Sequence, residues 1–419
     1  MDVLLQLILP YCKGGVYMKA CGVIVEYNPY HNGHVHHIKE TKKVSQADCI
    51  IAVMSGPFLQ RGEPAIIDKF ARAKAALESS VDIVMELPYL FAVQNSDIFA
   101  QGAVEILHKM GVSSICFGSE SGRIENFKES YQLLQKNKKV YEQRLKEHLN
   151  KGLSFPEASK LAYRSIGLSG ETDLAKPNNI LGFSYIKAIY DNQLPIEPLT
   201  IQRISNQFHE TDIRGNIASA TSIRKQLIEN NKLTEEAIQA LPTESISALK
   251  NYKLYSGDWH HWELYFPFLH YRVMTMKESE LGEILGVDEG IEYRIKKFAR
   301  KATSMYDWIR LIKTKRYTWT RIQRMFVHIL TNTKKQDVQH ILEENSAPPL
   351  RILGFTEKGR SYLKQLRKEN GPKLIFSLNT SLDPSLENDV RAARAYYSVF
   401  PPSIRNKLFR QELQPPIQV

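Results

Sequence analysis

The segment from Gly22 to His37 (GVIVEYNPYHNGHVHH) carries the residues best suited to chemistry. A β-branched run leads into the turn dipeptide Asn28-Pro29, after which His31-Asn32-Gly33-His34 opens a helical pattern. A glycine lets a phosphate approach closely, and the first N–H groups of a helix are free to bind an anion. His31 and His34 lie on the same side of that turn and can stabilise negative charge on a group in transfer. The segment therefore predicts a phosphate-binding site that does chemistry.

A second motif, IASATSIRK at 217–225, stands where a loop meets a helix. Ser219, Thr221 and Ser222 are small hydroxyl donors, and Arg224 follows one turn into the helix. These residues suit a clamp on the β- and γ-phosphates of a nucleotide. A serine or threonine in this place is also the usual helix N-cap, and both interpretations stay open at this point.

Strands and helices alternate over the first half of the chain and must position these motifs. The pattern predicts βαβ units and a parallel sheet, which binds ligands beyond the carboxyl ends of its strands. Loops after Tyr27, Met54, Leu87 and Phe117 should therefore face the site. The predicted strands are 20–27, 48–54, 81–87, 114–118 and 200–204, and the predicted helices are 33–44, 69–79, 97–110, a polar stretch over 128–164, and one from about 220.

The chain carries 56 Lys and Arg against 45 Asp and Glu, a net charge of +11. Residues 241–419 hold 29 of the basic and 19 of the acidic residues, in a mainly helical pattern with short strand elements near 350–354 and 374–378. The stretch 291–335 has 13 basic residues interleaved with aromatics. Basic side chains neutralise phosphates and aromatics stack on unpaired bases, so this stretch predicts RNA binding. The alternative is a solvated helical face.

Length and cysteine content exclude several other classes of protein. With 419 residues the chain is long enough for two or three domains. Its four cysteines contain no C-x-x-C pair, so neither a disulfide framework nor a zinc knuckle is expected. The cysteine content instead predicts a cytoplasmic location. The apolar run 3–11 is too short to cross a membrane. Residues 1–17 are predicted to be an extension before a strand pattern that opens at Met18.

Both motifs, in this order, resemble the HxGH nucleotidyltransferase superfamily, which transfers adenylyl groups from ATP. Ala218 and Ala220 depart from its second signature at positions that need no side chain. Longer phrases narrow the resemblance to the bacterial tRNA(Met) cytidine acetate ligase family. They are GVIVEYNPYHNGHVHH, AVMSGPFLQRGEPAIIDKFARAKAAL, DIVMELPYLFAVQNSDIFAQGAV, CFGSE, KPNNILGFSYIKAI and SATSIRK.

The resemblance implies an α/β fold: a Rossmann-like, ATP- and acetate-activating nucleotidyltransferase domain over 18–240, then a mainly helical, basic tRNA-binding domain over 241–419. It implies that ATP and acetate give acetyl-adenylate, and that the acetyl group passes to N4 of the wobble cytidine of elongator tRNA(Met). Mg²⁺ is expected to accompany ATP, with no dedicated protein metal site. No membrane and no obligate protein partner are expected.

Carried over residue by residue, the resemblance makes His31, His34 and Arg224 catalytic. One of Asn178 and Asn179 is implied to contact ATP, and because the sequence does not say which, both are included. The expected ATP contacts are Ile24, Val25, Glu26, Tyr27, Asn28, Pro29, Tyr30, His31, Asn32, Gly33, His34, Val35, His36, His37, Gly118, Asn178, Asn179, Arg203, Ser219, Thr221, Ser222 and Arg224. The expected tRNA contacts, from the basic stretch, are Arg294, Lys296, Lys297, Arg300, Lys313, Lys315, Arg321 and Arg324.

Four further features have both a functional and a structural interpretation. The loop Gln60–Pro64 is either a substrate loop or a turn, and Arg61 and Lys69 are candidates for phosphate or tRNA contact. Asp97 either caps its helix or lines the pocket. The pair His260-His261 is expected in the core or at an interface, and the cysteines are expected to be bystanders.

Three other functions compete with the tRNA ligase. One is an acetate ligase that acetylates a protein-bound thiol, as citrate lyase ligases do, and another is a cofactor-making adenylyltransferase. The third is an RNA-binding module with a vestigial nucleotide site. The basic second half of the chain disfavours the first two, and the complete histidine motif disfavours the third.

Overall fold

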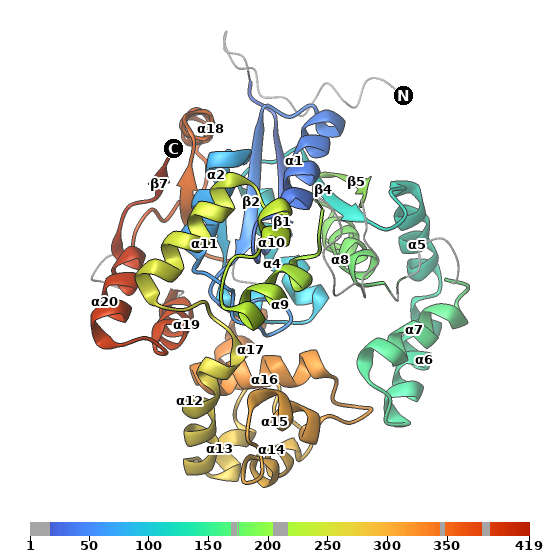
Figure 1. Ribbon diagram of the computed structural model, residues 1–419. Coiled ribbons are helices and arrows are strands. Elements are labelled where there is room, and N and C mark those ends of the chain that lie inside the picture. The colour runs from blue at the N-terminus through green and yellow to red at the C-terminus, as the bar shows by residue number, and fades with distance from the viewer. Residues whose placement is uncertain (1–16, 169–173, 175, 204–216, 344–347, 379–385) are drawn as a thin grey trace.

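A seven-stranded sheet organises the protein (Figure 1). The computed structural model describes residues 17–168, 174, 176–203, 217–343, 348–378 and 386–419, so the predicted extension lies almost wholly outside the described residues. The strand order is β5-β4-β1-β2-β3-β6-β7, with β1 to β5 parallel. The strands are β1 (Ala20–Val25), β2 (Cys49–Ser55), β3 (Ile83–Leu87), β4 (Ser114–Ser119), β5 (Glu197–Gln202), β6 (Ile352–Phe355) and β7 (Ile417–Gln418).

Helices cover both faces of the sheet, which is why β2 and β3 are buried along their whole length and consist mainly of apolar residues. Side chains of β2 alternate between the two faces. Ile51 and Val53 join the core beneath the helices Ser96–Lys109 and Pro177–Asp191, and Ile50 and Ala52 join the core beneath the helices Asn32–Ser45 and Lys69–Ser79. The helices in this half of the chain are α1 (Asn32–Ser45), α2 (Lys69–Ser79), α3 (Tyr89–Ala92), α4 (Ser96–Lys109), α5 (Ile124–Lys136), α6 (Lys138–Asn150), α7 (Phe155–Ser165), α8 (Pro177–Asp191) and α9 (Ala220–Asn230). The five strands and the helices predicted in this half are therefore confirmed.

A second group of helices packs around its own core below the sheet in Figure 1. We call these helices, α12 to α16, the helical unit. Four side chains are fully buried in its core: Leu269, Ile295, Trp308 and Phe326. The remaining helices are α10 (Glu235–Gln239), α11 (Thr243–Ser256), α12 (Trp262–Thr275), α13 (Glu278–Gly282), α14 (Ile291–Ala299), α15 (Met305–Ile312), α16 (Trp319–Thr331), α17 (Lys335–Glu343), α18 (Glu357–Lys368), α19 (Glu387–Tyr397) and α20 (Pro402–Arg410), with a 3₁₀ turn at Gln411–Leu413.

The sheet does not stop at the boundary predicted near residue 240. Strand β6 pairs antiparallel with β3, and β7 pairs with β6, so the last seventy residues return to the sheet of the first half. Of the second predicted strand element, 374–378, only a single bridge between Ile375 and Arg351 forms. The stretch 241–419 therefore contains the helical unit and a second part, the described residues from 348 to 419, which we call the return segment.

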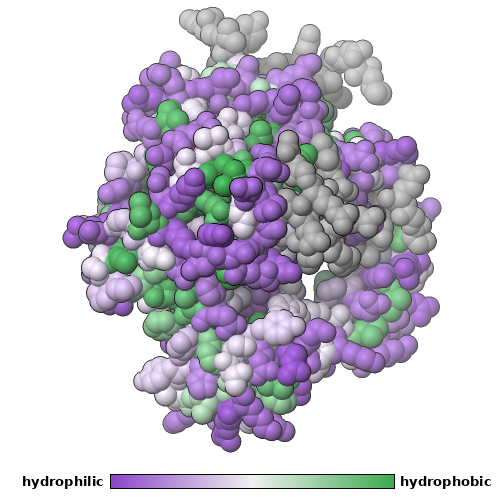
Figure 2. All heavy atoms as spheres, viewed as in Figure 1, coloured by the Kyte–Doolittle hydropathy of each residue, from purple (hydrophilic) through white to green (hydrophobic). Residues whose placement is uncertain are grey.

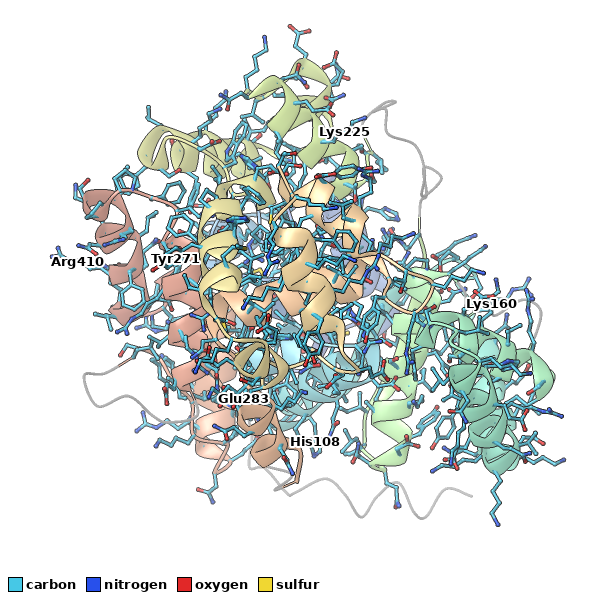
Figure 3. All side chains as sticks on the ribbon, turned by 90° about the horizontal axis from the view of Figure 1, so that it is seen from below. His108, Lys160, Lys225, Tyr271, Glu283 and Arg410 are labelled. Atoms are coloured by element: carbon cyan, nitrogen blue, oxygen red, sulfur yellow. The ribbon has the colours of Figure 1, made fainter. Side chains whose placement is uncertain are left out.

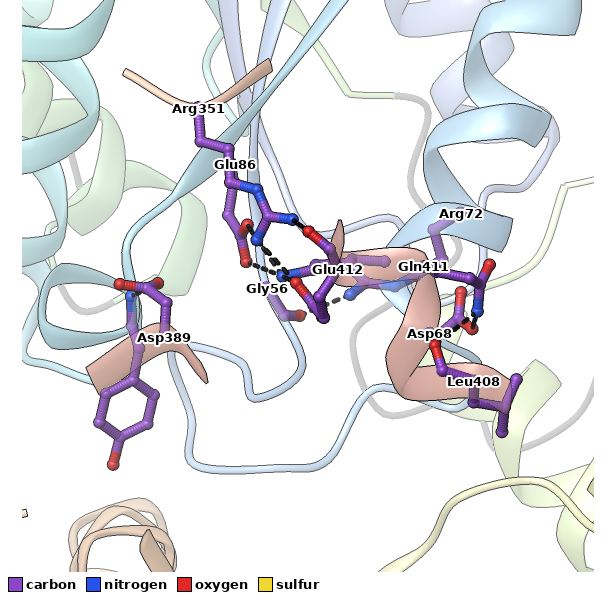
Figure 4. A network of polar contacts seen from close by, with 11 residues as sticks. Gly56, Asp68, Arg72, Glu86, Arg351, Asp389, Leu408, Gln411 and Glu412 are labelled. Atoms are coloured by element: carbon purple, nitrogen blue, oxygen red, sulfur yellow. Dashed lines mark hydrogen bonds and ion pairs between the residues drawn. The ribbon is translucent and has the colours of Figure 1, made fainter. Parts of the chain in front are cut away.

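Buried ion pairs fix the return segment to the sheet (Figure 4). Glu412 and Glu86 both contact Arg351, at 2.7 and 3.0 Å. Lys69 contacts the same two carboxylates, at 2.8 and 2.7 Å. All four side chains are at most 4% exposed, so each charge depends on the others for its stability.

Hydrophilic residues cover most of the face shown in Figure 2, with smaller hydrophobic patches between them. Within the described residues, no helix has the length and hydropathy to cross a membrane.

Candidate active site

The histidine motif begins α1 at the carboxyl end of β1. His31 is the N-cap residue, and its Nδ1 accepts a hydrogen bond from the backbone N–H of Gly33 at 3.0 Å. The Nδ1 of His34 accepts from the backbone N–H of His31 at 3.2 Å, which completes a reciprocal capping box. The two imidazoles lie close together, with ring centroids 3.8 Å apart and ring planes tilted by 31°.

These contacts fix the protonation of both rings. Because Nδ1 accepts in each, the proton of the neutral ring lies on Nε2. Burial, together with Arg203 and Arg224, lowers the pKa of His31 to about 3, and burial beside His31 lowers the pKa of His34 well below its usual value. Both rings are therefore neutral at pH 7 and offer Nε2–H as donors. The positive charge of the site comes from arginines.

Gly33 is required where it stands. A Cβ at this position would lie 2.8 Å from Cε1 of His31, so any side chain would displace the capping imidazole. The expectation of free N–H groups at the start of α1 is wrong for this structure. Asn32 donates its backbone N–H to the carbonyl of Ala240 at 3.0 Å, because the end of α10 lies against the helix start, and Gly33 donates to His31.

The second motif meets the first, as its predicted role requires. Arg224 donates to the carbonyl of Asn28 at 2.9 Å and pairs with Glu63 at 2.9 Å. Ser219 is the N-cap of α9, and its hydroxyl lies 2.9 Å from that of Ser222. The helix-cap interpretation of Ser219 is therefore confirmed, and the phosphate clamp stays a prediction. Thr221 is the exposed hydroxyl of the three.

A third cluster forms at the carboxyl ends of β4 and β5. The side-chain oxygen of Asn178 accepts from Arg203 at 2.8 Å, and its amide donates to Glu120 at 2.8 Å. Asn179 is buried and accepts the backbone N–H of Glu120, which fixes the loop after β4. A Cβ on Gly118 would lie 3.0 Å from Cγ of Arg203, so the glycine leaves this arginine its place. Glu120 is not among the residues predicted from the sequence, because nothing local distinguishes it.

Arg72 is a second residue that sequence reasoning missed. It is buried and donates to the carbonyls of Glu26, Ser55 and Gly56, at 2.6, 3.1 and 2.5 Å. It thereby ties α2 to the chain after β1 and β2, two of the ends that face the site. Its position in a helix between two buried strands is the sequence feature that could have indicated a buried arginine with backbone partners.

The structure settles the surroundings of three residues that the sequence singled out, and two of them have partners that were not predicted. Lys69 lies in the buried ion cluster and so cannot reach a phosphate or tRNA. Asp97 does not cap α4, because the N-cap residue is Asn95. Its carboxylate instead forms an ion pair with Lys187 on α8 at 2.9 Å. The predicted structural role of His260 is confirmed: the ring is buried and stacks on Tyr396 with centroids 3.6 Å apart.

The cysteines described by the structure have free, buried thiols. Burial raises the pKa of Cys21, Cys49 and Cys116, for Cys116 to about 12, so these thiols are protonated at neutral pH. This state suits their predicted role as bystanders. Cys12 lies outside the described residues.

Comparison with known proteins agrees with this arrangement. The model of the HIGH Nucleotidyl Transferase family matches residues 18–412. A tRNA(Met) cytidine acetate ligase of Oceanobacillus iheyensis is 52% identical over 96% of this chain and 100% of its own length. The protein of the same description from Bacillus subtilis is 45% identical over 94% and 96%. The chain belongs to the tRNA(Met) cytidine acetate ligase family.

Solved structures of this family have the same fold. Apo Thermotoga maritima TmcAL superposes with a TM-score of 0.87 at 35% identity, covering 96% of this chain and 100% of that one. Thermotoga maritima TmcAL bound with alpha-thio ATP superposes with a TM-score of 0.85 at 34% identity, with the same coverage.

In this member of the tRNA(Met) cytidine acetate ligase family, the eight predicted tRNA contacts fall into three groups. Arg294 and Lys296 hold the helical unit together, since Arg294 donates to two carbonyls at the end of α15 and Lys296 donates to the carbonyl of Met276. Arg321 and Arg324 lie on α16, where Arg324 donates to the carbonyl of Gln60 at 3.5 Å. The exposed residues are Lys297, Arg300, Lys313 and Lys315.

The predicted loop at Gln60–Pro64 joins the helical unit to the site. A Cβ on Gly62, whose φ is +76°, would lie 2.4 Å from the backbone nitrogen of Arg324, so the loop lies directly on α16. Its other end carries Glu63, the partner of Arg224. Figure 3 views the helical unit from below, with Tyr271 on α12 and Glu283 marking this end of the molecule.

Proposed function

We propose that this chain uses ATP to activate acetate as acetyl-adenylate and transfers the acetyl group to N4 of the wobble cytidine of elongator tRNA(Met). The junction of the two motifs carries the proposal. Arg224 reaches Asn28 across 196 residues of sequence, beside two imidazoles that are held as neutral donors. The names of the relatives and the ATP analogue bound to the Thermotoga maritima protein support it.

The roles of the side chains follow from their geometry and charge. When a carboxylate attacks the α-phosphate, negative charge grows on the phosphate oxygens, and preorganised donors stabilise it. The Nε2–H groups of His31 and His34 are such donors, and Arg224 and Arg203 supply the charge that the leaving pyrophosphate needs. Asn178, which is less buried than Asn179 and bonded to Arg203, is the better candidate for contact with the nucleotide.

Mg²⁺ would be held mainly by the phosphates of ATP and by water. Among the described residues, no group of three or more His, Cys, Asp or Glu side chains could hold a metal ion. The protein's own contribution to charge neutralisation is therefore its arginines.

For tRNA, we propose the exposed basic residues of the helical unit together with Arg321 and Arg324. This assigns activation to the sheet and RNA binding to the helical unit. The loop Gln60–Pro64 lies between them, so the acceptor cytidine would approach the acetyl-adenylate beside this loop.

The test is acetate-dependent exchange of labelled pyrophosphate into ATP, with and without tRNA(Met), followed by transfer of labelled acetate to the tRNA. Citrate, nicotinamide mononucleotide and phosphopantetheine serve as competing substrates. Exchange with a cofactor precursor, or acetyl transfer to a thiol in place of tRNA, would contradict the proposal.

The variant His34→Ala should lower exchange by about 10²–10³-fold, the usual effect of losing one charge-stabilising donor. Its tRNA affinity, measured by filter binding, should match that of the unchanged protein, because His34 lies in the sheet half. Loss of tRNA binding would contradict the division of roles.

A further inference from the structure

Acetyl transfer to cytidine needs a proton acceptor. The N4 lone pair is delocalised into the base, so the nitrogen becomes nucleophilic only as its proton leaves, and general base catalysis contributes typically about 10²–10⁴-fold. We propose that the carboxylate of Glu26 takes this proton. This inference rests on the proposed function and assigns one residue to its second step.

Glu26 lies where the two halves of the reaction meet. It follows β1 directly and precedes the turn that leads to His31. One carboxylate oxygen, Oε1, accepts the backbone N–H of Gln60 at 2.8 Å, in the loop that lies on α16. The other oxygen makes no hydrogen bond to any residue that the structure describes. Glu26 is thus held by the loop between the nucleotide site and the helical unit, with one oxygen available.

The other candidate bases of the site are already engaged. His31 and His34 use their basic Nδ1 atoms to accept backbone N–H groups. Glu63 is paired with Arg224 at 2.9 Å. Glu120 accepts from the amide of Asn178. Of these three carboxylates, only Glu26 has no side-chain partner among the described residues: its carboxylate accepts from a backbone N–H. It also lies at the carboxyl end of β1, directly before the histidine motif.

The surroundings of Glu26 suit a base. Burial raises the pKa of Glu26, and the negative charge of Glu63 raises it further, whereas the positive charges of Arg61 and Arg224 lower it. From α8, Tyr185 faces the same region, and from α2 the guanidinium of Arg72 holds the carbonyl of Glu26. A carboxylate with a raised pKa is a stronger base, and the arginines keep it ionised near neutral pH.

The step balances as follows. The N4 lone pair attacks the acetyl carbonyl carbon of acetyl-adenylate and forms a C–N bond. The bond between that carbon and the bridging phosphate oxygen breaks, and AMP leaves with its electron pair. The N4 proton passes to the free oxygen of Glu26 and then to solvent.

The experiment supplies acetyl-adenylate directly, so that transfer to tRNA(Met) is measured in single turnover without activation. Glu26→Gln should slow this transfer by about 10²–10⁴-fold, a much larger loss than in pyrophosphate exchange. Glu63→Gln is the matched control, because it loosens Arg224: its larger loss should be in exchange. Equal losses of both steps in Glu26→Gln would overturn the assignment.

The pH profile separates a base from a structural role. Transfer by the unchanged protein should fall as the pH drops through the pKa of Glu26, since the protonated form cannot accept, and Glu26→Gln should lose this limb. Glu26→Asp, which keeps the carboxylate, should retain the limb at a lower rate. A limb that persists in Glu26→Gln would place the base elsewhere. Absence of transfer by the unchanged protein would instead refute the proposed function.

Discussion

At the scale of single residues, the site depends on backbone groups holding imidazoles. In His31 and His34 alike, Nδ1 accepts a hydrogen bond from a backbone N–H. This contact orients the ring and favours its neutral form. We expect such rings to stabilise developing charge as hydrogen-bond donors, and the arginines around them to attract the phosphates. The two-histidine motif therefore holds two Nε2–H groups in fixed orientations.

Gly33→Ala should therefore reduce pyrophosphate exchange strongly while leaving the fold intact. The added Cβ would approach Cε1 of His31 to 2.8 Å, and the ring must move. Gly282→Ala is the control, since a Cβ there meets nothing within 4 Å. Circular dichroism should show both variants folded. Normal exchange in Gly33→Ala would mean that the position of the His31 ring is unimportant.

At the scale of elements, α14 and α16 present basic residues in different ways. Tyr293 and Lys297 on α14 and Arg300 at its C-cap are spaced four and three residues apart and are all exposed, so they form one face. Arg321 and Arg324 on α16 lie beside the loop Gln60–Pro64. We expect the first group to contact the body of the tRNA and the second group to contact the nucleotide that enters the site.

Lys297→Glu combined with Arg300→Glu should weaken tRNA binding and reduce the slope of log affinity against log salt by about 1 for each phosphate that is no longer neutralised. Lys138→Glu with Lys139→Glu, exposed on α6, is the matched control and should leave the slope unchanged. The opposite result would move the RNA surface to α5–α7. Affinities should be measured over a series of salt concentrations.

At the scale of the whole molecule, stability depends on the return of the chain to its own sheet. Arg351 and Glu412 come from the return segment, and Glu86 and Lys69 come from the first hundred residues. Removing one member of a buried ion cluster leaves the others uncompensated. The segment is thus part of the same folding unit as the site.

Arg351→Met should lower the free energy of unfolding by about 3–5 kcal/mol, the usual result of breaking a buried ion pair. Arg391→Met provides the comparison: its pair with Asp337 is about one-third exposed at the arginine, and the cost should stay below about 1 kcal/mol. Urea unfolding measures both. Similar losses in the two variants would mean that the buried cluster adds nothing to stability.

The sequence by itself determined the local features of this protein. Apolar runs and helical periodicity were enough to predict five parallel strands and the helices between them, because these patterns arise within a few residues. The histidine motif and the motif at 217–225 could also be found in the sequence, because a helix cap, a glycine and a turn each involve only a few neighbouring residues.

Only the tertiary structure decided what each charged residue does. Lys69 became a buried ion-pair member because Glu412, 343 residues later, lies 2.8 Å away. Arg294 and Lys296 donate to carbonyls at helix ends, and the loop at Gln60 binds one carboxylate oxygen of Glu26. A long-range partner leaves no periodic trace in the chain, and the same side chain binds a ligand or holds the fold according to what lies within a few ångströms of it.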